Sequence, residues 1–234
     1  YKRQTNIRLR AGGIFALVSQ SLGLEAGGAI GVPLFLAQSL GAALYIYGFA
    51  EGWRFLFPDH SYGLIIFSIF LVGFSLSFIS EKLVLRLQLL VMIGVIVALG
   101  SMFAGFYTAP VLHTPKLWGE FPEASLYVLF AVFFPAGTGI KVGASLSGKL
   151  KDPRRSIPIG VLAAWGTAFV VYAGLIFWYA MVATPEELAG NYMIAVEKAA
   201  WGPAVMIGLL SSCASAMLSS MVAAPNVLAA LGQH

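Results

Sequence analysis

The chain contains six apolar runs that are each long enough to cross a lipid bilayer. They lie near residues 27–50, 62–80, 87–107, 125–147, 157–182 and 203–230. A transmembrane helix needs about 20 predominantly apolar residues. Backbone inside hydrocarbon must satisfy its own hydrogen bonds, so isolated apolar runs of this length form helices. We therefore predict an all-α polytopic membrane protein in which residues 1–234 form a single transmembrane domain.

Composition and charge agree with this prediction. The chain is 59% hydrophobic and 10% charged, whereas soluble domains carry about 25% charged residues. If the N-terminus is cytoplasmic, ten lysines and arginines fall on inner segments and only Arg54, Lys116 and Lys198 fall on outer loops. This asymmetry follows the positive-inside rule. The basic clusters are therefore signals of membrane orientation, and we expect no nucleic-acid partner.

The fourth apolar run is interrupted at its centre. Residues 133–160 read FFPAGTGIKVGASLSGKLKDPRRSIPIG, with Pro135, Gly137 and Gly139 close together and Lys141 following. A helix broken inside the membrane is tolerated where its free backbone groups line a cavity or hold a ligand, as at the binding sites of many secondary transporters. We predict a helix broken at 134–139, with an ordinary proline kink as the alternative. Lys141 either pairs with an anion in the cavity or extends to the inner surface.

A broken helix can hold two ions of opposite charge. The N–H groups and positive dipole end of a half-helix beginning near Gly139 favour an anion. The carbonyl groups freed before the break, with the Thr138 hydroxyl, favour a cation. An enzyme is poorly supported, because Ser145 in the GASL stretch has no histidine in any apolar run to act as its base.

The loop at 183–202 should contain a helix. Thr184-Pro185-Glu186-Glu187 fits a capping box with proline at the first helical position.

Four stretches together resemble the cation–chloride cotransporter family of the amino acid–polyamine–organocation superfamily. The 133–160 run is similar to the family's sixth-span signature. The other three are TNIRLRAGGIFALVSQSLGLEAGGAIG, GAALYIYGFAE and SSCASAMLSSMVAAP, which are similar to segments of its second, third and eighth spans. The resemblance implies part of a LeuT-type fold of two inverted five-helix repeats. It also implies that the chain is a fragment, running from late in the second span to the eighth.

The resemblance also implies ion ligands. Potassium would be held by Tyr45, Pro135 and Thr138, chloride by backbone amides at Gly139, Ile140 and Lys141, and sodium by the backbone carbonyl of Ser212 and the hydroxyl of Ser215. Two positions depart from the family pattern. Lys141 replaces an apolar residue, and Ala216 replaces a serine whose hydroxyl would bind sodium, so sodium coupling is in doubt.

These features predict a secondary-active symporter that couples potassium, with sodium as an open alternative, to chloride by alternating access in the cell membrane. We expect inorganic ions and membrane lipids as partners and no cofactor. A homodimer is compatible with these features. The alternatives are an amino acid permease with the same fold and a non-transporting membrane regulator.

Overall fold

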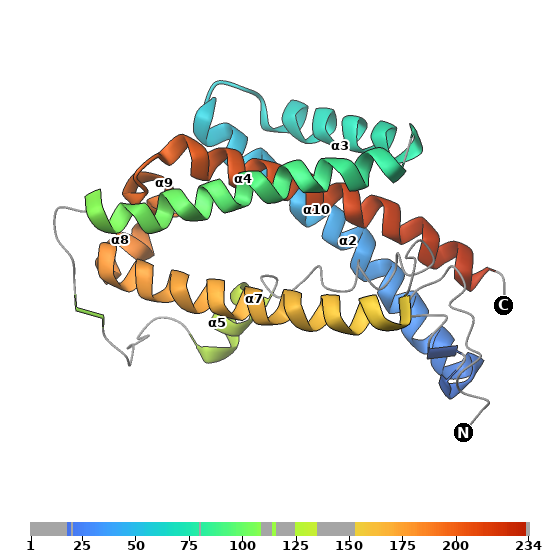
Figure 1. Cartoon of the computed structure of the whole chain (residues 1–234). Helices are drawn as coiled ribbons and strands as arrows, with labels where there is room; N and C mark the ends of the chain where they lie inside the picture. Colours follow the sequence, from blue (N-terminus) through green and yellow to red (C-terminus); the bar gives the residue numbers. More distant parts are fainter. Residues whose placement is uncertain are drawn as a thin grey trace. The chain divides into compact units, whose positions relative to one another are not determined.

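The structure is a computed structural model that describes residues 18–19, 21–79, 81–108, 114–115, 125–134 and 153–232. Its described elements are helices: α2 (Leu24–Leu56), α3 (Tyr62–Ile79), α4 (Glu81–Thr108), α5 (Leu126–Phe133), α7 (Pro153–Val182), α8 (Pro185–Gly190), α9 (Ile194–Lys198) and α10 (Gly202–Leu231) (Figure 1). The described residues contain no strand. The predicted all-α class is therefore confirmed.

Several of these helices match the membrane-spanning runs. Among the described residues, four segments are long and apolar enough to cross a bilayer: Leu24–Leu56, Arg86–Thr108, Pro158–Val182 and Gly202–Leu231. The apolar part of α3, Tyr62–Ser77, is shorter. Helix α5 covers only the start of the fourth run, and residues 135–152 lie outside the described part of the chain. The predicted break at 134–139 therefore stays a prediction beyond Phe134.

Helices α2 and α10 extend past the apolar runs that predicted them. Helix α2 begins after Gly23, whose φ of 95° lies in the left-handed region, which glycine adopts without steric cost. Pro33 lies inside α2 and Pro225 inside α10. A proline in a transmembrane helix removes one N–H, and the turns on either side keep their own hydrogen bonds.

The chain divides into two compact units. The first comprises residues 1–87, 139–164 and 213–234, and the second comprises residues 88–138 and 165–212. Helices α4, α7 and α10 each contribute residues to both units, so each unit combines segments that are distant in the sequence. The prediction of a single transmembrane domain is not tested by this division.

The first unit has its core between α2, α3 and the C-terminal part of α10. Ile46, Met217 and Leu218 form the buried cluster, and Tyr45 packs against it. Close packing here depends on a small residue, because a Cβ atom at Gly73 would lie 3.2 Å from the sulfur atoms of Met217 and Met221.

The second unit is built around Trp178, which is fully buried. Met102, Val182 and Val205 surround it and come from α4, α7 and α10. Helix α5 joins this unit through an edge-on contact between the rings of Phe133 and Tyr172, whose centroids are 5.9 Å apart.

Candidate functional site

Three of the eight predicted ligand residues lie in the described part of the chain. Tyr45 lies on α2, and Ser212 and Ser215 lie on α10. The other five, Pro135, Thr138, Gly139, Ile140 and Lys141, lie outside the described residues. Helix α5 ends at Phe133, with Phe134 as its C-cap, so the described helix stops directly before Pro135.

Two glycines bring α2 and α10 close together in the first unit. A Cβ atom built on Gly48 would lie 3.4 Å from Sγ of Cys213, and one built on Gly41 would lie 3.8 Å from Oγ of Ser220. Gly41 lies seven residues before Gly48, and its partner Ser220 lies seven residues after Cys213. The two helices are antiparallel here and pack side by side through small residues, as transmembrane helices commonly do.

This pairing fixes which residues share a level in the membrane. Counting from the contact between Gly48 and Cys213, Tyr45 lies level with Ala216 and one residue from Ser215. The Tyr45 side chain is half-buried and packs against the cluster of Ile46, Met217 and Leu218. Tyr45 and Ser215 thus lie at similar depths, but Ser215, two residues after Cys213, lies on the face of α10 turned away from α2.

The two predicted sodium ligands differ in how their hydroxyls are used. The Ser212 hydroxyl donates to the carbonyl of Gly208 at 2.6 Å. The Ser215 hydroxyl makes no hydrogen bond with any described residue, although its carbonyl accepts from the Ser219 hydroxyl at 2.9 Å. Ser215 is therefore the one of the two with a hydroxyl oxygen available to an ion.

A cavity of about 570 Å³ lies between α2, α3 and α10, on the N-terminal side of Tyr45 along α2. Its polar side chains mostly bond to their own helices. The Ser39 hydroxyl donates to the Phe35 carbonyl, and Nδ2 of Asn226 donates to the Val222 carbonyl. The remaining lining is largely aromatic and aliphatic. Such a surface does not compensate a dehydrated ion, so this cavity is a poor ion site.

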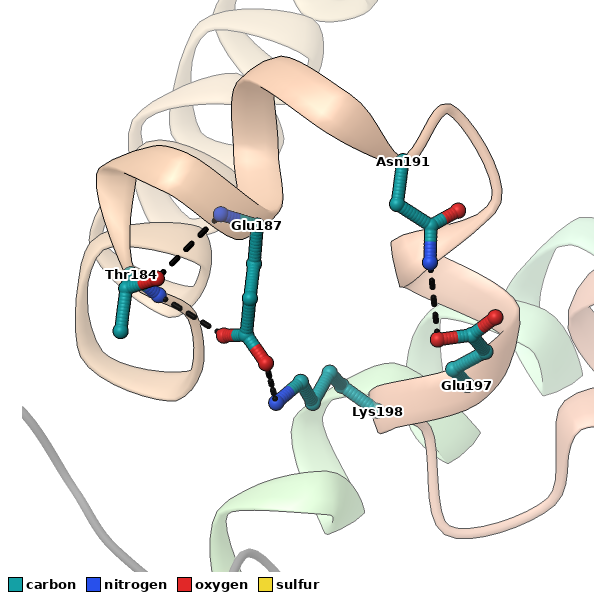
Figure 2. Close-up of polar contacts among 5 residues, drawn as sticks. All are labelled: Thr184, Glu187, Asn191, Glu197 and Lys198. Atoms are coloured by element: carbon teal, nitrogen blue, oxygen red, sulfur yellow. Dashed lines mark hydrogen bonds and ion pairs between the residues drawn. The ribbon is translucent and has the colours of Figure 1, made fainter.

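In the second unit, helices α8 and α9 are held by polar contacts (Figure 2). The Thr184 hydroxyl accepts from the Glu187 N–H at 3.2 Å, and the Glu187 carboxylate accepts from the Thr184 N–H at 2.9 Å. The predicted capping box is therefore confirmed. Glu187 also pairs with Lys198 at 2.8 Å, and Asn191 donates to Glu197 at 2.8 Å, which links α8 to α9.

The residues that follow α9 are hydrogen-bonded to α4. The Ser101 hydroxyl accepts from the Trp201 N–H at 2.8 Å and donates to the Trp201 carbonyl at 2.9 Å. The Ala200 N–H donates to the Ser101 carbonyl at 3.0 Å. The α8–α9 segment is thus a fixed part of the second unit.

A model of the amino acid permease family matches residues 4–234. The chain belongs to the amino acid permease family. Because the members of this family are membrane transporters, and four described segments can span a bilayer, the chain is an integral membrane protein of a transporter family and not an enzyme.

Three curated relatives show which branch of the family this chain resembles. Solute carrier family 12 member 8 of Xenopus laevis is 32% identical over 240 residues, covering 96% of this chain and 33% of that protein. Solute carrier family 12 member 2 of Homo sapiens is 27% identical over 289 residues, covering 97% of this chain and 24% of that protein. Cation-chloride cotransporter 1 of Oryza sativa subsp. japonica is 28% identical over 288 residues, covering 97% and 29%.

These relatives confirm the resemblance to cation–chloride cotransporters that the 133–160 run predicted. They are transporters by name, in agreement with the prediction of transport rather than catalysis. The chain spans between a quarter and a third of the length of these three relatives.

Sequence reasoning missed the glycines that set the position of Tyr45. Gly41 and Gly48 are seven residues apart, as are Cys213 and Ser220, so each pair lies on one face of its helix. That spacing is a usable signal for close helix packing. The spacing alone does not predict which helix packs against the face of α2 that carries Gly41 and Gly48.

Proposed function

We propose that the protein is a secondary-active symporter that couples potassium to chloride by alternating access. The observation that carries the proposal is the α2–α10 pair, in which Tyr45 lies level with Ala216 and packs against the buried cluster of Ile46, Met217 and Leu218. The names of the relatives, which include a cation-chloride cotransporter, support the same function.

In this proposal the cation is bound between a fixed wall and a broken helix. The close contacts of Gly41 and Gly48 with α10 make α2 and α10 the fixed wall, from which Tyr45 offers a phenolic oxygen. Pro135 and Thr138 would complete the site from the fourth apolar run. Alternating access would then consist of movement of that run against the wall.

Chloride would bind beside the cation, at the start of the second half-helix. The N–H groups of Gly139, Ile140 and Lys141 would donate to it, as the free N–H groups at a helix N-terminus do to anions generally. The Lys141 side chain would add a positive charge. This arrangement couples the two ions, because each one reduces the electrostatic cost of binding the other.

Potassium fits the α10 residues better than sodium does. Ser212 lies inside a continuous helix, where its carbonyl already belongs to the helical hydrogen-bond ladder. Ser215 offers one hydroxyl, which makes no hydrogen bond with any described residue, and Ala216 offers none. Sodium, bound through several hard oxygen ligands, would lack one of them, so we propose that sodium does not drive transport.

An amino acid permease is the second candidate, favoured by the family whose model matches almost the whole chain. In that case the half-helix N-terminus would bind the substrate carboxylate in place of chloride. Both candidates use the same fold and the same anion-binding end, so they differ in the ligand and not in the architecture.

The test is rubidium uptake into proteoliposomes that contain the complete protein. Uptake is measured in chloride, in gluconate, and in gluconate with a mixture of amino acids. Uptake that requires chloride supports the proposed symport. Uptake that requires an amino acid and not chloride supports the second candidate. Uptake that depends on neither, in protein that is monodisperse before reconstitution, contradicts both.

A further inference from the structure

A second cavity in the first unit lies at the end of α2 that is predicted to face outward. It has a volume of about 600 Å³, within the 300–1,000 Å³ range of ligand pockets. We call it the outer pocket. Its rim is formed by Trp53 of α2 and by Asp59, His60 and Ser61 of the turn before α3, and its floor runs along α3 to Val72.

The rim holds the imidazole of His60 in one orientation. Nε1 of Trp53 donates to Nδ1 of His60 at 3.1 Å. The rings of Phe57 and His60 are stacked with centroids 5.2 Å apart and planes 12° apart. Because Nδ1 accepts a hydrogen bond, the proton of the neutral ring is on Nε2. His60 therefore presents an N–H donor.

Asp59 supplies the opposite chemistry at the same rim. Its side chain is exposed and makes no hydrogen bond or ion pair with any other described residue. Ser61, two residues later, adds a hydroxyl. Three consecutive residues thus offer a carboxylate for a cation and two donors for an anion. This pattern is complementary to a zwitterion.

Below the rim the pocket becomes apolar. Leu64, Ile65, Ile69 and Val72 line it along α3, and Leu64 and Val72 remain exposed, with 67% and 53% of their surface accessible. This part of the pocket follows α3, the helix of the second apolar run, which we predict to lie in the membrane. The pocket changes from charged at its rim to apolar at its floor, as a phospholipid changes from its head group to its acyl chains.

We propose that the outer pocket binds phosphatidylethanolamine. The ammonium group is held by the Asp59 carboxylate, and the phosphate accepts from Nε2–H of His60 and from the Ser61 hydroxyl. The upper part of one acyl chain lies along Leu64, Ile65 and Val72. A phospholipid that lacks the ammonium group leaves Asp59 unpaired and next to a phosphate of like charge, which disfavours it.

The test is native mass spectrometry of the complete protein released from nanodiscs. The nanodiscs contain equal amounts of phosphatidylethanolamine and phosphatidylglycerol with identical acyl chains. Wild-type protein retains phosphatidylethanolamine preferentially. Asp59→Asn lowers that preference by about fivefold, the upper end for an exposed ion pair. Ser68 also lines the pocket on α3, and Ser68→Leu, which fills the apolar floor, lowers retention of both lipids.

The matched control is Glu186→Gln, which removes one negative charge from an exposed position on the same predicted side of the membrane. It leaves the lipid preference unchanged. Equal retention of the two lipids by wild-type protein, or an unchanged preference in Asp59→Asn, overturns the proposal. Displacement of the bound lipid by soluble phosphoethanolamine at low millimolar concentration would show that the head group alone is recognised, and would overturn the assignment of the apolar floor.

Discussion

Gly208→Ala is predicted to destabilise the second unit by forcing α10 away from α4. A Cβ atom at Gly208 would lie 2.6 Å from Cβ of Ala98, about 1 Å closer than the optimal separation of ~3.5–4.0 Å between carbon atoms. Both atoms are attached directly to helical backbone, so no side-chain rotation relieves the contact. The helices must separate or shift.

The size of the effect follows from two opposing terms. Replacing glycine by alanine in a helix gains about 1 kcal/mol of helix propensity. Overpacking in a dense interior costs about 1–3 kcal/mol. Since the overlap here involves two main-chain-anchored atoms, we expect the upper part of that range and a net loss of about 1–2 kcal/mol. A shift of α10 at Gly208 also disturbs Ser212, whose hydroxyl donates to the Gly208 carbonyl.

The assay is the thermal unfolding midpoint of the complete protein in detergent, followed by loss of the monodisperse chromatography peak. Gly100→Ala on α4 is the matched control, because nothing lies within 4 Å of its new Cβ atom. The control should unfold at the wild-type temperature or above it, and Gly208→Ala should unfold below it.

A second change tests the reason for the effect. In Gly208→Ala combined with Ala98→Gly, the nearest remaining contact of the new Cβ atom is the Gly94 carbonyl oxygen at 3.4 Å. The double variant should regain most of the lost stability. A Gly208→Ala variant as stable as Gly100→Ala, or a double variant less stable than Gly208→Ala, would refute the close α4–α10 packing.

Three further predictions concern single side chains. Thr184→Ala should lose about 1 kcal/mol of local stability, measured as faster amide hydrogen exchange in α8, whereas Glu187→Gln should lose less, because glutamine keeps the capping box and the ion pair is partly exposed. Ser101→Ala removes both side-chain hydrogen bonds to Trp201 and should cost about 1–2 kcal/mol, seen as faster exchange in α9 and a lower unfolding midpoint. Ser215→Ala should leave the unfolding midpoint unchanged, since its hydroxyl has no partner among the described residues, and should leave the rubidium affinity unchanged, since Ser215 is not among the proposed potassium ligands.

Much of the helical layout was predictable because it depends on local properties of the chain. Apolar runs of spanning length identify α2, α4, α7 and α10, since lipid leaves a continuous apolar segment few alternatives to a helix. The capping box at Thr184 was readable for the same reason, because all its groups lie within four residues. Only the exact ends were missed, as at Gly23, where a positive φ starts α2 earlier than the apolar run does.

Contacts between helices were not predictable in the same way. The approach of Gly208 to Ala98 joins residues more than one hundred positions apart, and the sequence around each is equally compatible with other partners. The Trp53–His60 bond is closer in sequence, but it depends on how the turn at 57–61 folds back on α2. For the site, the resemblance identified Tyr45 as a ligand, whereas its position opposite α10 required the structure.

Rubidium affinity tests most directly whether Tyr45 is a cation ligand on the α2–α10 wall. Tyr45→Phe removes one oxygen and little volume, so the half-saturating rubidium concentration for uptake should rise about tenfold, which corresponds to ~1.4 kcal/mol. Tyr47→Phe, two residues away with an exposed side chain that contacts the Tyr62 ring of α3, should stay within about twofold of wild type. A folded Tyr45→Phe protein with unchanged rubidium affinity, or an equal shift in both variants, would contradict the proposed site.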